Sequence, residues 1–354
     1  MTKELWKGNE AIAEAAIKAG CKHFFGYPIT PQNEIPEYMS LRMPQVDGCF
    51  VQAESEVAAI NMVYGAAGAG ARVMTSSSSP GISLKMEGIT YIAGSELPCL
   101  IVNIVRGGPG LGGIQPAQSD YFQATKGGGH GDYRLVVLAP SSVQEAVDLT
   151  QVSFDIADQY RNPVMIMADG MIGQMMEPVE FKEVEKRQLP AKDWATDGGT
   201  KGNRGKNIIN SLFIDPAECE LHNQKLARKY AEIEKNEVRF ETYNMEGAEL
   251  VFVAYGTVAR IVRNAINTLE KQGIKAGLIR PITLWPYPYA EIQKAAAQSS
   301  VKAFMSVEMS MGQMVEDVKL GVNGVKPVHF YGRTGGMIPT PADIVEAAKK
   351  ALEV

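Results

Sequence analysis

The chain has 354 residues, of which 45% are hydrophobic and 21% are charged, and its net charge at pH 7 is −5. This length allows two domains, each with a core of its own. The mild negative charge and the lack of a basic run argue against nucleic-acid binding and against binding to a membrane surface. The N-terminus lacks the apolar stretch of a signal peptide, and no apolar run is long enough to span a bilayer, so we expect a cytoplasmic protein.

The cysteines and histidines give no sign of a metal centre. The four histidines are scattered, and no two of the four cysteines form a CxxC pair. Their spacing matches neither a zinc site nor an iron–sulfur cluster. We therefore expect reduced, mostly buried thiols and no metal site in this chain.

The first 178 residues alternate between helical and strand patterns, which favours a parallel α/β sheet. Two of the predicted strands are apolar apart from Asn103, as expected for strands that are covered on both faces. The predicted strands are His23–Gly26, Cys49–Ala53, Arg72–Thr75, Leu100–Val105, Arg134–Ala139 and Pro163–Met167. The predicted helices are Asn9–Ala19, one that begins at Glu34–Met39, Glu56–Gly68, Leu84–Gly94 and Ser142–Tyr160, the last capped by Ser142.

Residues 179–246 are more charged and are interrupted by glycine pairs. We interpret them as a connector that partly folds over the first domain, with a surface helix at Leu221–Lys235. From residue 247 to 354 the alternation returns and predicts a second, smaller parallel α/β domain. Its predicted strands are Leu250–Ala254, Ala276–Ile279, Val301–Val307 and Val328–Tyr331, and its predicted helices are Ala259–Gln272, Tyr289–Ser299, Met314–Leu320 and Pro341–Leu352.

The stretch Val51–Gly81 carries the clearest sign of chemistry. Glu54 and Glu56 stand at the start of an Ala-rich helix that is apolar nearly all round. Two residues apart on a helix, they point in different directions, so both cannot line one pocket. Burial of this helix would bury a carboxylate at its tip, and a buried carboxylate needs a specific partner because burial disfavours its charge. The alternative is that both acids only interact with the positive end of the helix dipole.

Three other predicted strands are followed by polar residues. In the segment YPITP, the residue before each proline is held in an extended conformation, which presents Thr30 to a ligand. The alternative is that Thr30 or Asn33 caps the next helix. Arg106 lies between a strand and the segment GGPGLGG, and it either holds a small carboxylate or is a surface arginine. Ser76–Ser79 predicts a polar loop, either lining a cleft or without a special role. Because the carboxyl ends of parallel strands meet at one edge of a sheet, we predict a cofactor pocket there.

The chain lacks the usual motifs that bind phosphate. The glycine runs Gly107–Gly113 and Gly127–Gly131 match neither a dinucleotide nor a P-loop fingerprint. The chain also lacks the GDG and asparagine pattern expected where magnesium holds a diphosphate, since Ala168–Gly170 is not followed by a suitable asparagine. If a phosphorylated cofactor binds here, another chain must hold its phosphates.

With these residues in view, the sequence resembles the alpha-type subunit of a 2-oxoacid:ferredoxin oxidoreductase over essentially its whole length. The segments that carry the resemblance are GYPITPQNEI, QAESEVAAINMVYGAAGAGARVMTSSSSPGISLKMEGI, IVNIVRGGPG and GLIRPITLWPYP. The segments KGGGHGDYRLVVLAPSSVQEA and MADGMIGQMMEP are most similar to the branched-chain version, which acts on 2-oxoisovalerate (3-methyl-2-oxobutanoate). The 2-oxoglutarate version has similar motifs and stands as the alternative.

The resemblance implies the fold and the partners. Residues 1–178 would form a thiamine-diphosphate-binding-type domain on the pyrimidine side of that cofactor, and residues 247–354 a transketolase C-terminal-like domain. A beta-type subunit would hold the magnesium ion, the diphosphate and an iron–sulfur cluster. Further implied partners are a ferredoxin-like subunit, ferredoxin and a second copy of this chain. The implied reaction is the oxidative decarboxylation of a 2-oxoacid with coenzyme A to acyl-CoA, CO2 and reduced ferredoxin.

The resemblance also assigns site residues. It implies that Glu56 is the carboxylate that hydrogen-bonds the aminopyrimidine ring, because Ser-Glu before a small apolar run matches the family pattern. Glu54 is then only an acid at the start of the helix. Such a carboxylate favours the imino form of the ring, whose imino group then removes the C2 proton of the thiazolium. The other implied contacts are Tyr27, Pro28 and Ile29 to the cofactor and Thr30 and Arg106 to the substrate.

Two other interpretations of this resemblance remain. The chain could be half of a different thiamine enzyme that has no ferredoxin partner, or an assembly subunit that shares the fold without catalysing the reaction. A beta-type partner with a cysteine motif of its own would exclude the first. A Glu56→Gln variant that assembles but has no turnover would exclude the second.

Overall fold

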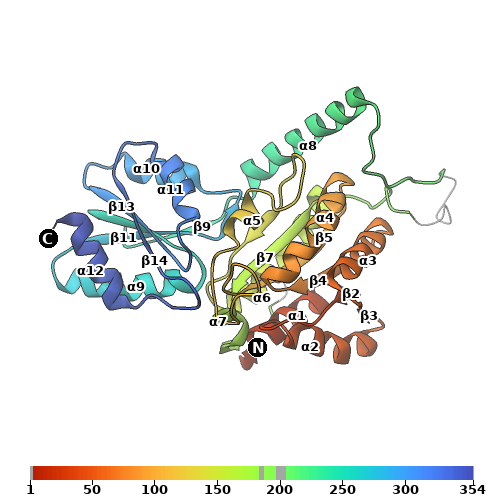
Figure 1. Cartoon of the computed structure of the whole chain (residues 1–354), viewed down its shortest axis with the longest axis horizontal. Coiled ribbons are helices and arrows are strands. Elements are labelled where there is room, and N and C mark those ends of the chain that lie inside the picture. The colour runs from red at the N-terminus through yellow and green to blue at the C-terminus, as the bar shows by residue number, and fades with distance from the viewer. Residues whose placement is uncertain (1–2, 183–186, 197–204, 354) are drawn as a thin grey trace.

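The computed structural model describes residues 3–182, 187–196 and 205–353. They form two α/β units that lie side by side, and helix α8 (Pro216–Asn236) extends along the first unit (Figure 1). The side chains of α8 that are buried, Leu226, Tyr230 and Ile233, belong to the core of that first unit. The predicted α/β fold class is therefore confirmed. Within the described residues, no helix combines the length and apolarity needed to cross a membrane.

The first unit is built on a seven-stranded sheet with the order β12-β6-β7-β5-β4-β2-β3. Its six parallel strands are β2 (His23–Gly26), β3 (Cys49–Gln52), β4 (Val73–Ser77), β5 (Cys99–Val105), β6 (Val136–Leu138) and β7 (Pro163–Asp169). The seventh strand, β12 (Thr283–Trp285), comes from the second half of the chain and pairs with β6 in antiparallel orientation. It covers an edge of the sheet that would otherwise expose unpaired backbone groups.

Helices cover both faces of this sheet, because successive side chains of its strands point to opposite sides. Ile101 of β5 packs with α3 (Glu56–Gly68) and α4 (Ser79–Gly94) on one face. Its neighbours Leu100 and Val102 pack with α1 (Gly8–Lys18), α2 (Glu34–Arg42) and α6 (Val143–Tyr160) on the other. The shorter helices are α5 (Tyr121–Thr125), α7 (Gly170–Gln174) and a 3-10 helix at Met43–Val46.

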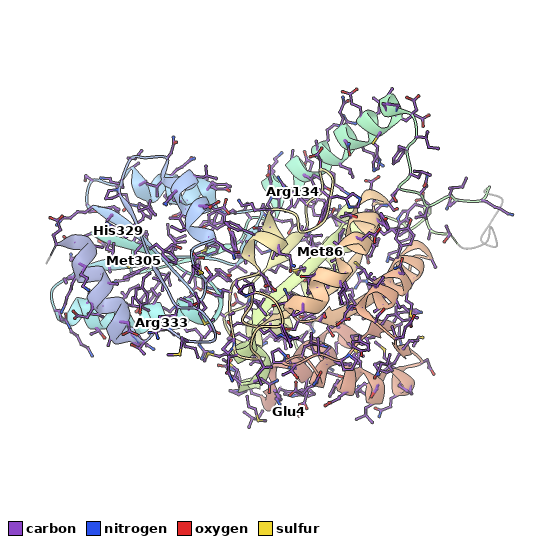
Figure 2. All side chains as sticks on the ribbon, viewed as in Figure 1. Glu4, Met86, Arg134, Met305, His329 and Arg333 are labelled. Atoms are coloured by element: carbon purple, nitrogen blue, oxygen red, sulfur yellow. The ribbon has the colours of Figure 1, made fainter. Side chains whose placement is uncertain are left out.

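The second unit has a five-stranded sheet with the order β14-β13-β10-β11-β9. Four of its strands are parallel, and β9 lies antiparallel to β11 at one edge. The strands are β9 (Phe240–Tyr243), β10 (Leu250–Val253), β11 (Ala276–Pro281), β13 (Ala303–Glu308) and β14 (Val328–Gly332), and the helices are α9 (Gly256–Lys271), α10 (Tyr289–Ala296), α11 (Met314–Val322) and α12 (Pro341–Leu352). Side chains fill the interior of both units, with Met86 in the first and Met305 in the second (Figure 2).

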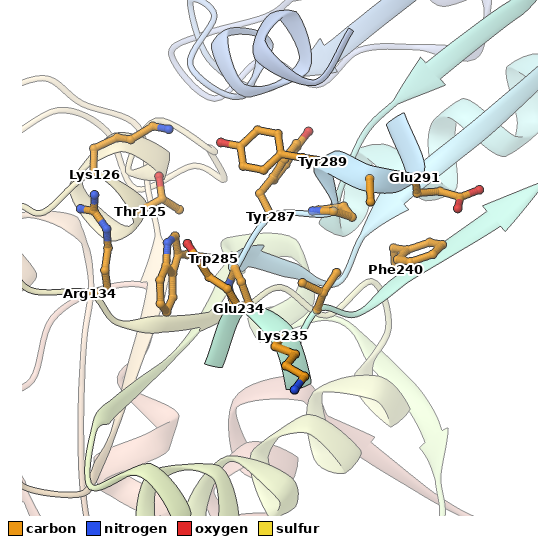
Figure 3. Close-up of a pocket in the computed structure, with 14 residues that line it drawn as sticks. Thr125, Lys126, Arg134, Glu234, Lys235, Phe240, Trp285, Tyr287, Tyr289 and Glu291 are labelled. Carbon is orange, nitrogen blue, oxygen red and sulfur yellow. The ribbon is translucent and has the colours of Figure 1, made fainter. Parts of the chain in front are cut away.

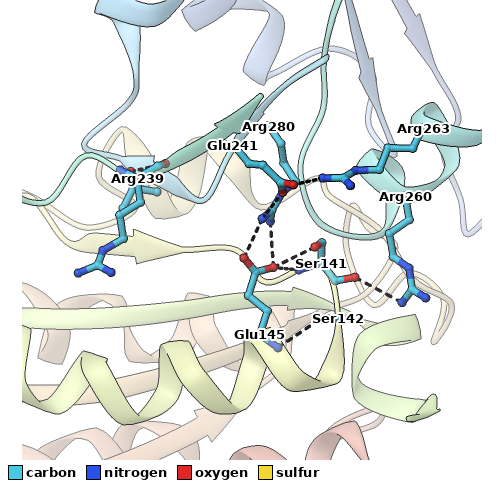
Figure 4. A network of polar contacts seen from close by, with 9 residues as sticks. Ser141, Ser142, Glu145, Arg239, Glu241, Arg260, Arg263 and Arg280 are labelled. Carbon is cyan, nitrogen blue, oxygen red and sulfur yellow. Dashed lines mark hydrogen bonds and ion pairs between the residues drawn. The ribbon is translucent and has the colours of Figure 1, made fainter. Parts of the chain in front are cut away.

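A network of charged side chains joins the two units (Figure 4). Arg280 of β11 is 5% exposed, and its Nη1 and Nη2 donate to the Glu145 carboxylate of α6 over 2.9 and 2.8 Å. Its Nε donates to Glu241 of β9 over 2.9 Å. Because a guanidinium and a carboxylate that form two parallel hydrogen bonds fix each other's orientation, this contact holds β11 against the start of α6.

Several element boundaries differ from the predicted ones. The predicted loop at Ser76–Ser79 is wrong: Ser76 and Ser77 end β4, Ser79 begins α4, and Ser78 alone lies between them. A proline near the start of a helix costs no backbone hydrogen bond, and the N-terminal turns of α4 and α8 contain Pro80 and Pro216. Both helices therefore begin about five residues earlier than predicted.

Some short elements were not predicted at all. β1 (Glu4–Lys7) pairs with β8 (Met176–Val179) in a two-stranded antiparallel sheet. The edge strands β9 and β12 and the short helices α5 and α7 were also missed. Segments of three to five residues carry too little periodicity to be recognised in a sequence.

Candidate functional site

The predicted site residues gather at one edge of the first sheet. Because β5, β4 and β2 are neighbours and run parallel, the residues that follow them lie close together. Ser79 shows this directly: its Oγ accepts a hydrogen bond from the Arg106 backbone nitrogen over 3.1 Å. The Nη1 of Arg106 in turn donates to the Thr30 carbonyl over 2.9 Å. The structure thus brings Thr30 and Arg106 together, as predicted for the edge of a parallel sheet.

Arg106 is not a surface residue. Only 6% of it is exposed, and its Nη2 donates to the Leu111 carbonyl over 3.0 Å. Its Nε is buried without a hydrogen-bond partner among the described residues. A guanidinium has five N–H donors. This side chain therefore keeps donors for a carboxylate even while it binds the carbonyls of Thr30 and Leu111.

The two acids at the start of α3 differ in burial. Glu54 is exposed, whereas Glu56 is the first residue of the helix and is only 6% exposed. Ser55 caps the helix, with its side chain accepting a hydrogen bond from the Ala58 nitrogen. The carboxylate of Glu56 therefore lies at the positive end of a helix dipole, inside the protein, where it is favoured electrostatically.

Gly81 makes room for the Glu56 carboxylate. A Cβ atom at position 81 would stand 2.6 Å from Oε1 of Glu56 and 2.1 Å from Oγ of Ser77. The first turn of α4, the end of β4 and the first residue of α3 therefore meet at one point. A residue without a side chain is required there by this close approach.

The close packing at Gly81 gives a stability prediction. We expect Gly81→Ala to displace Glu56 or Ser77 and to lower the free energy of unfolding by about 1–3 kcal/mol, as overpacking in a core does. Chemical denaturation measures the change. Gly65→Ala on α3 is the matched control, because a Cβ there meets no atom within 4 Å. Equal stabilities for the two variants would contradict this account.

The segment after β2 is held by Gln32, a residue that no pattern in the sequence had indicated. Ser76 Oγ donates to Gln32 Oε1 over 2.5 Å, and Gln32 Nε2 donates to the Tyr27 carbonyl over 3.2 Å. Tyr27, Pro28 and Thr30 are exposed along this segment, and Ile29 is half-buried. The predicted cap is not observed, since α2 has Asn33 at its N-cap without a side-chain cap bond.

Two buried ionisable groups near the site were also missed. Lys85 on α4 is fully buried, and its Nζ donates to Thr75 Oγ1 over 2.9 Å and to the Ser76 carbonyl over 3.2 Å. Burial lowers the pKa of Lys85 to about 7, although attraction by Glu56 opposes this. Asp120 accepts a hydrogen bond from Asn103 Nδ2 over 2.9 Å, and burial raises its pKa. Lys85 falls on the apolar stripe of its helix, a signal that could have revealed it.

Several other buried polar atoms at this edge have no hydrogen-bond partner within the described ranges. They are Ser77 Oγ, Ser78 Oγ, Asn103 Oδ1 and Arg106 Nε. Buried polar groups are normally satisfied, so these atoms are exceptions that need an explanation. Two hydroxyls, an amide oxygen and a guanidinium nitrogen are all able to form hydrogen bonds with a polar group.

A pocket of about 530 Å³ opens beside these residues, between the two units. It is lined from the first unit by Pro80, Gly107–Gly110 and Asp120, and from the second by Met309–Met311 and Gly335. Another pocket, of about 570 Å³, lies around Trp285 and Tyr289 (Figure 3). Neither pocket is lined by Glu56, Thr30 or Arg106, but the first is lined by Ser79, which accepts a hydrogen bond from the Arg106 backbone nitrogen, and by Gly107. The candidate site is therefore the sheet edge beside the first of these two pockets.

Family comparisons agree with this geometry. The family described as "Pyruvate flavodoxin/ferredoxin oxidoreductase, thiamine diP-bdg" matches residues 14–243, and "Pyruvate:ferredoxin oxidoreductase core domain II" matches residues 248–344. The chain belongs to the 2-oxoacid:ferredoxin oxidoreductase family. It is an alpha-type subunit of that family, as the sequence predicted, with a thiamine-diphosphate-binding-type domain.

Individual relatives match over nearly the whole chain. The ketoisovalerate oxidoreductase subunit VorB of Methanothermobacter marburgensis is 51% identical over 99% of this chain and 98% of its own. The 2-oxoglutarate synthase subunit KorA of Methanothermobacter thermautotrophicus is 36% identical over 99% of both chains.

Solved structures show the same fold. The 2-oxoglutarate:ferredoxin oxidoreductase from Magnetococcus marinus, solved with 2-oxoglutarate, coenzyme A and succinyl-CoA bound, has a TM-score of 0.88 and 29% identity. The match covers 99% of this chain and 65% of that one. A split-gene transketolase has a TM-score of 0.61 at 16% identity, which shows similarity of fold alone.

Proposed function

We propose that this chain forms the pyrimidine side of a thiamine diphosphate site in an enzyme that oxidatively decarboxylates 2-oxoisovalerate with coenzyme A to acyl-CoA, CO2 and reduced ferredoxin. The buried Glu56 carboxylate carries the proposal, because it lies at the same sheet edge as Thr30 and Arg106. The identity of 51% to a ketoisovalerate oxidoreductase subunit, against 36% to a 2-oxoglutarate synthase subunit, supports the branched-chain substrate.

Each site residue has a proposed task. Glu56 hydrogen-bonds the ring nitrogen of the aminopyrimidine, and Tyr27, Pro28 and Ile29 form the wall against that ring. Thr30 and Arg106 hold the carboxylate of the 2-oxoacid, for which the planar guanidinium is well suited. Bound thiamine diphosphate supplies the nucleophilic carbon and accepts the electrons released by decarboxylation.

The proposal includes partners and an organisation of the chain. Because the sequence has no phosphate-binding fingerprint, a beta-type subunit would hold the diphosphate, Mg²⁺ and an iron–sulfur cluster. A ferredoxin-like subunit, ferredoxin and a dimer of this chain complete a cytoplasmic hetero-oligomer. Residues 1–178 would be the pyrimidine-side domain, residues 179–246 the connector and residues 247–354 the transketolase C-terminal-like domain.

Comparing substrates tests this function. The chain is co-purified with its partner subunits, and ferredoxin reduction is measured with 2-oxoisovalerate, 2-oxoglutarate and pyruvate in the presence of coenzyme A. We expect the highest kcat/KM with 2-oxoisovalerate. A preference for 2-oxoglutarate would overturn the substrate assignment and favour the 2-oxoglutarate version. Activity without any ferredoxin requirement would favour a different thiamine enzyme.

Arg106 gives a prediction that separates substrate binding from cofactor binding. We expect Arg106→Lys to raise KM for the 2-oxoacid about tenfold or more, because lysine keeps the charge but loses the two-pronged contact. Thiamine diphosphate affinity, measured by calorimetry on the same complex, should change little. Arg134→Gln, at an exposed position in the other pocket, is the control. An unchanged KM in Arg106→Lys would show that this side chain does not bind substrate.

A further inference from the structure

Residues 207–214, which we call the arm, carry exposed apolar side chains that alternate with half-buried ones. The exposed ones are Ile208, Leu212 and Ile214, at 86%, 67% and 86%. The half-buried ones are Ile209, Ser211 and Phe213. A period of two is the pattern of an extended chain, with one row of side chains on the protein and the other in solvent. The arm leads into α8 on the side of the first unit that faces away from the second unit (Figure 1).

The half-buried side chains hold the arm on the first unit. Ile209 packs against the hydrophobic core of that unit. The ring of Phe213 is stacked on the ring of His222 in α8, with 4.5 Å between their centres. His222 Nε2 in turn donates to the carbonyl of Gly94, the last residue of α4, over 2.7 Å. The arm is therefore positioned before a partner binds, so that docking requires little further ordering of the chain.

The backbone of the arm has no backbone hydrogen-bond partner among the described residues. Leu212 bonds locally instead, since its nitrogen donates to Asn210 Oδ1 and its carbonyl accepts from Asn210 Nδ2, each over 2.8 Å. An extended segment with free N–H and C=O groups is an edge to which another strand can add, and an apolar edge favours aggregation when it is left uncovered. The arm therefore has the features of a docking strand.

The charges at the two ends of the arm favour a second copy of this chain as its partner. Residues 207–214 are uncharged, with Lys206 before them and Asp215 after them. When two arms pair antiparallel about a two-fold axis, Lys206 of each copy comes near Asp215 of the other, and the two apolar rows stay on one face. Parallel pairing would bring like charges together. The preceding residues 197–204, DGGTKGNR, have no apolar side chain with which to cover the row.

We propose that the arms of two copies of this chain pair antiparallel and bury their rows of Ile208, Leu212 and Ile214 against each other. The inference rests on the dimer of this chain given under the proposed function, and it assigns that dimer a contact surface. The contact is separate from the thiamine site. Glu56 begins α3, whereas Ile209 lies at Gly68, the other end of this helix of 13 residues, about 20 Å away.

The first test measures self-association of the full chain by analytical ultracentrifugation over a range of concentrations, without cofactor. We expect the original chain to form a dimer. Leu212→Asp should raise its Kd about 100-fold or more, because a symmetric contact then buries two like charges. Leu320→Asp on α11 is the matched control, since Leu320 is 63% exposed and lies on the second unit, and it should leave the Kd unchanged. Circular dichroism verifies the fold of each variant.

A double-mutant cycle tests the antiparallel direction. Lys206→Glu and Asp215→Lys each bring like charges together and should raise the Kd about fivefold, since exposed ion pairs are weak. The combined variant restores unlike charges and should dimerise more tightly than Asp215→Lys alone. Asp215 also caps α8 by accepting a hydrogen bond from the Ala217 nitrogen, and the cycle cancels the loss of that cap. Nine extended residues separate the two charges within one chain by about 30 Å, so any coupling arises between copies.

Three results would overturn the pairing of the arms. They are a monomeric original chain, a dimer that Leu212→Asp leaves intact, and the absence of coupling between Lys206 and Asp215. In the assembled complex, a Leu212→Asp variant that keeps the dimer but loses a partner subunit would assign the row to that subunit instead. None of these measurements uses turnover. The function proposed for Glu56 is therefore decided separately, by the comparison of substrates.

Discussion

Glu56→Gln is expected to reduce turnover of the assembled complex about 10³-fold, within the usual range for loss of a group that assists proton transfer. Glutamine keeps the size of the side chain and one carbonyl oxygen, but it cannot exchange a proton with a ring nitrogen. The residue is 6% exposed and is the first residue of α3. Because glutamine fills the same buried space, its replacement should act on the chemistry more than on the fold. Steady-state ferredoxin reduction measures the effect, with size-exclusion chromatography to verify assembly.

Glu54→Gln is the matched control for this prediction. Glu54 lies two residues earlier, and it is exposed. Its replacement removes the same charge from the same region without touching the buried carboxylate. We expect turnover within about twofold of the original, since an exposed charge contributes little. Normal turnover in Glu56→Gln would show that the chain assembles the enzyme without supplying this carboxylate.

The main features of the site could be predicted because they depend on strand ends. The parallel arrangement of β2, β4 and β5 follows from alternating patterns, and it brings Thr30 and Arg106 to one edge. The choice between Glu54 and Glu56 did not follow from periodicity, since both acids stand at the helix start. It came from the resemblance, and the structure adds that only Glu56 is buried.

The missed residues depend on contacts between distant segments. Gln32 acts through Ser76, 44 positions away, and Asp120 through Asn103, 17 positions away. No local pattern reveals such pairs. The serine run was misread for a related reason: serines usually mark loops, but Ser76 and Ser77 are fully buried in β4, where neighbouring strands satisfy their backbone groups.

Lys85→Met is expected to stabilise the chain at pH 7, although it removes a group of the site. Burial lowers the pKa of Lys85 from 10.5 to about 7. The folded state therefore binds fewer protons at this side chain than the unfolded state does between these pH values. Such a shift costs the folded protein on the order of 4 kcal/mol at and below pH 7. Methionine removes this cost but leaves the Thr75 hydroxyl without its hydrogen-bond donor. The loss of that bond reduces the expected gain in the free energy of unfolding by about 1 kcal/mol.

The sign of the pH dependence distinguishes this cause from simple repacking. The cost is complete below pH 7 and fades as pH rises towards 10.5, because the lysine of the unfolded chain then loses its proton as well. The stabilisation by Lys85→Met, measured by denaturant unfolding, should therefore be largest at pH 7 and should shrink towards pH 10. Lys235→Met, at an exposed position, should change stability little at either pH. A loss of stability at pH 7 would mean that interactions within the fold compensate for the buried charge of Lys85.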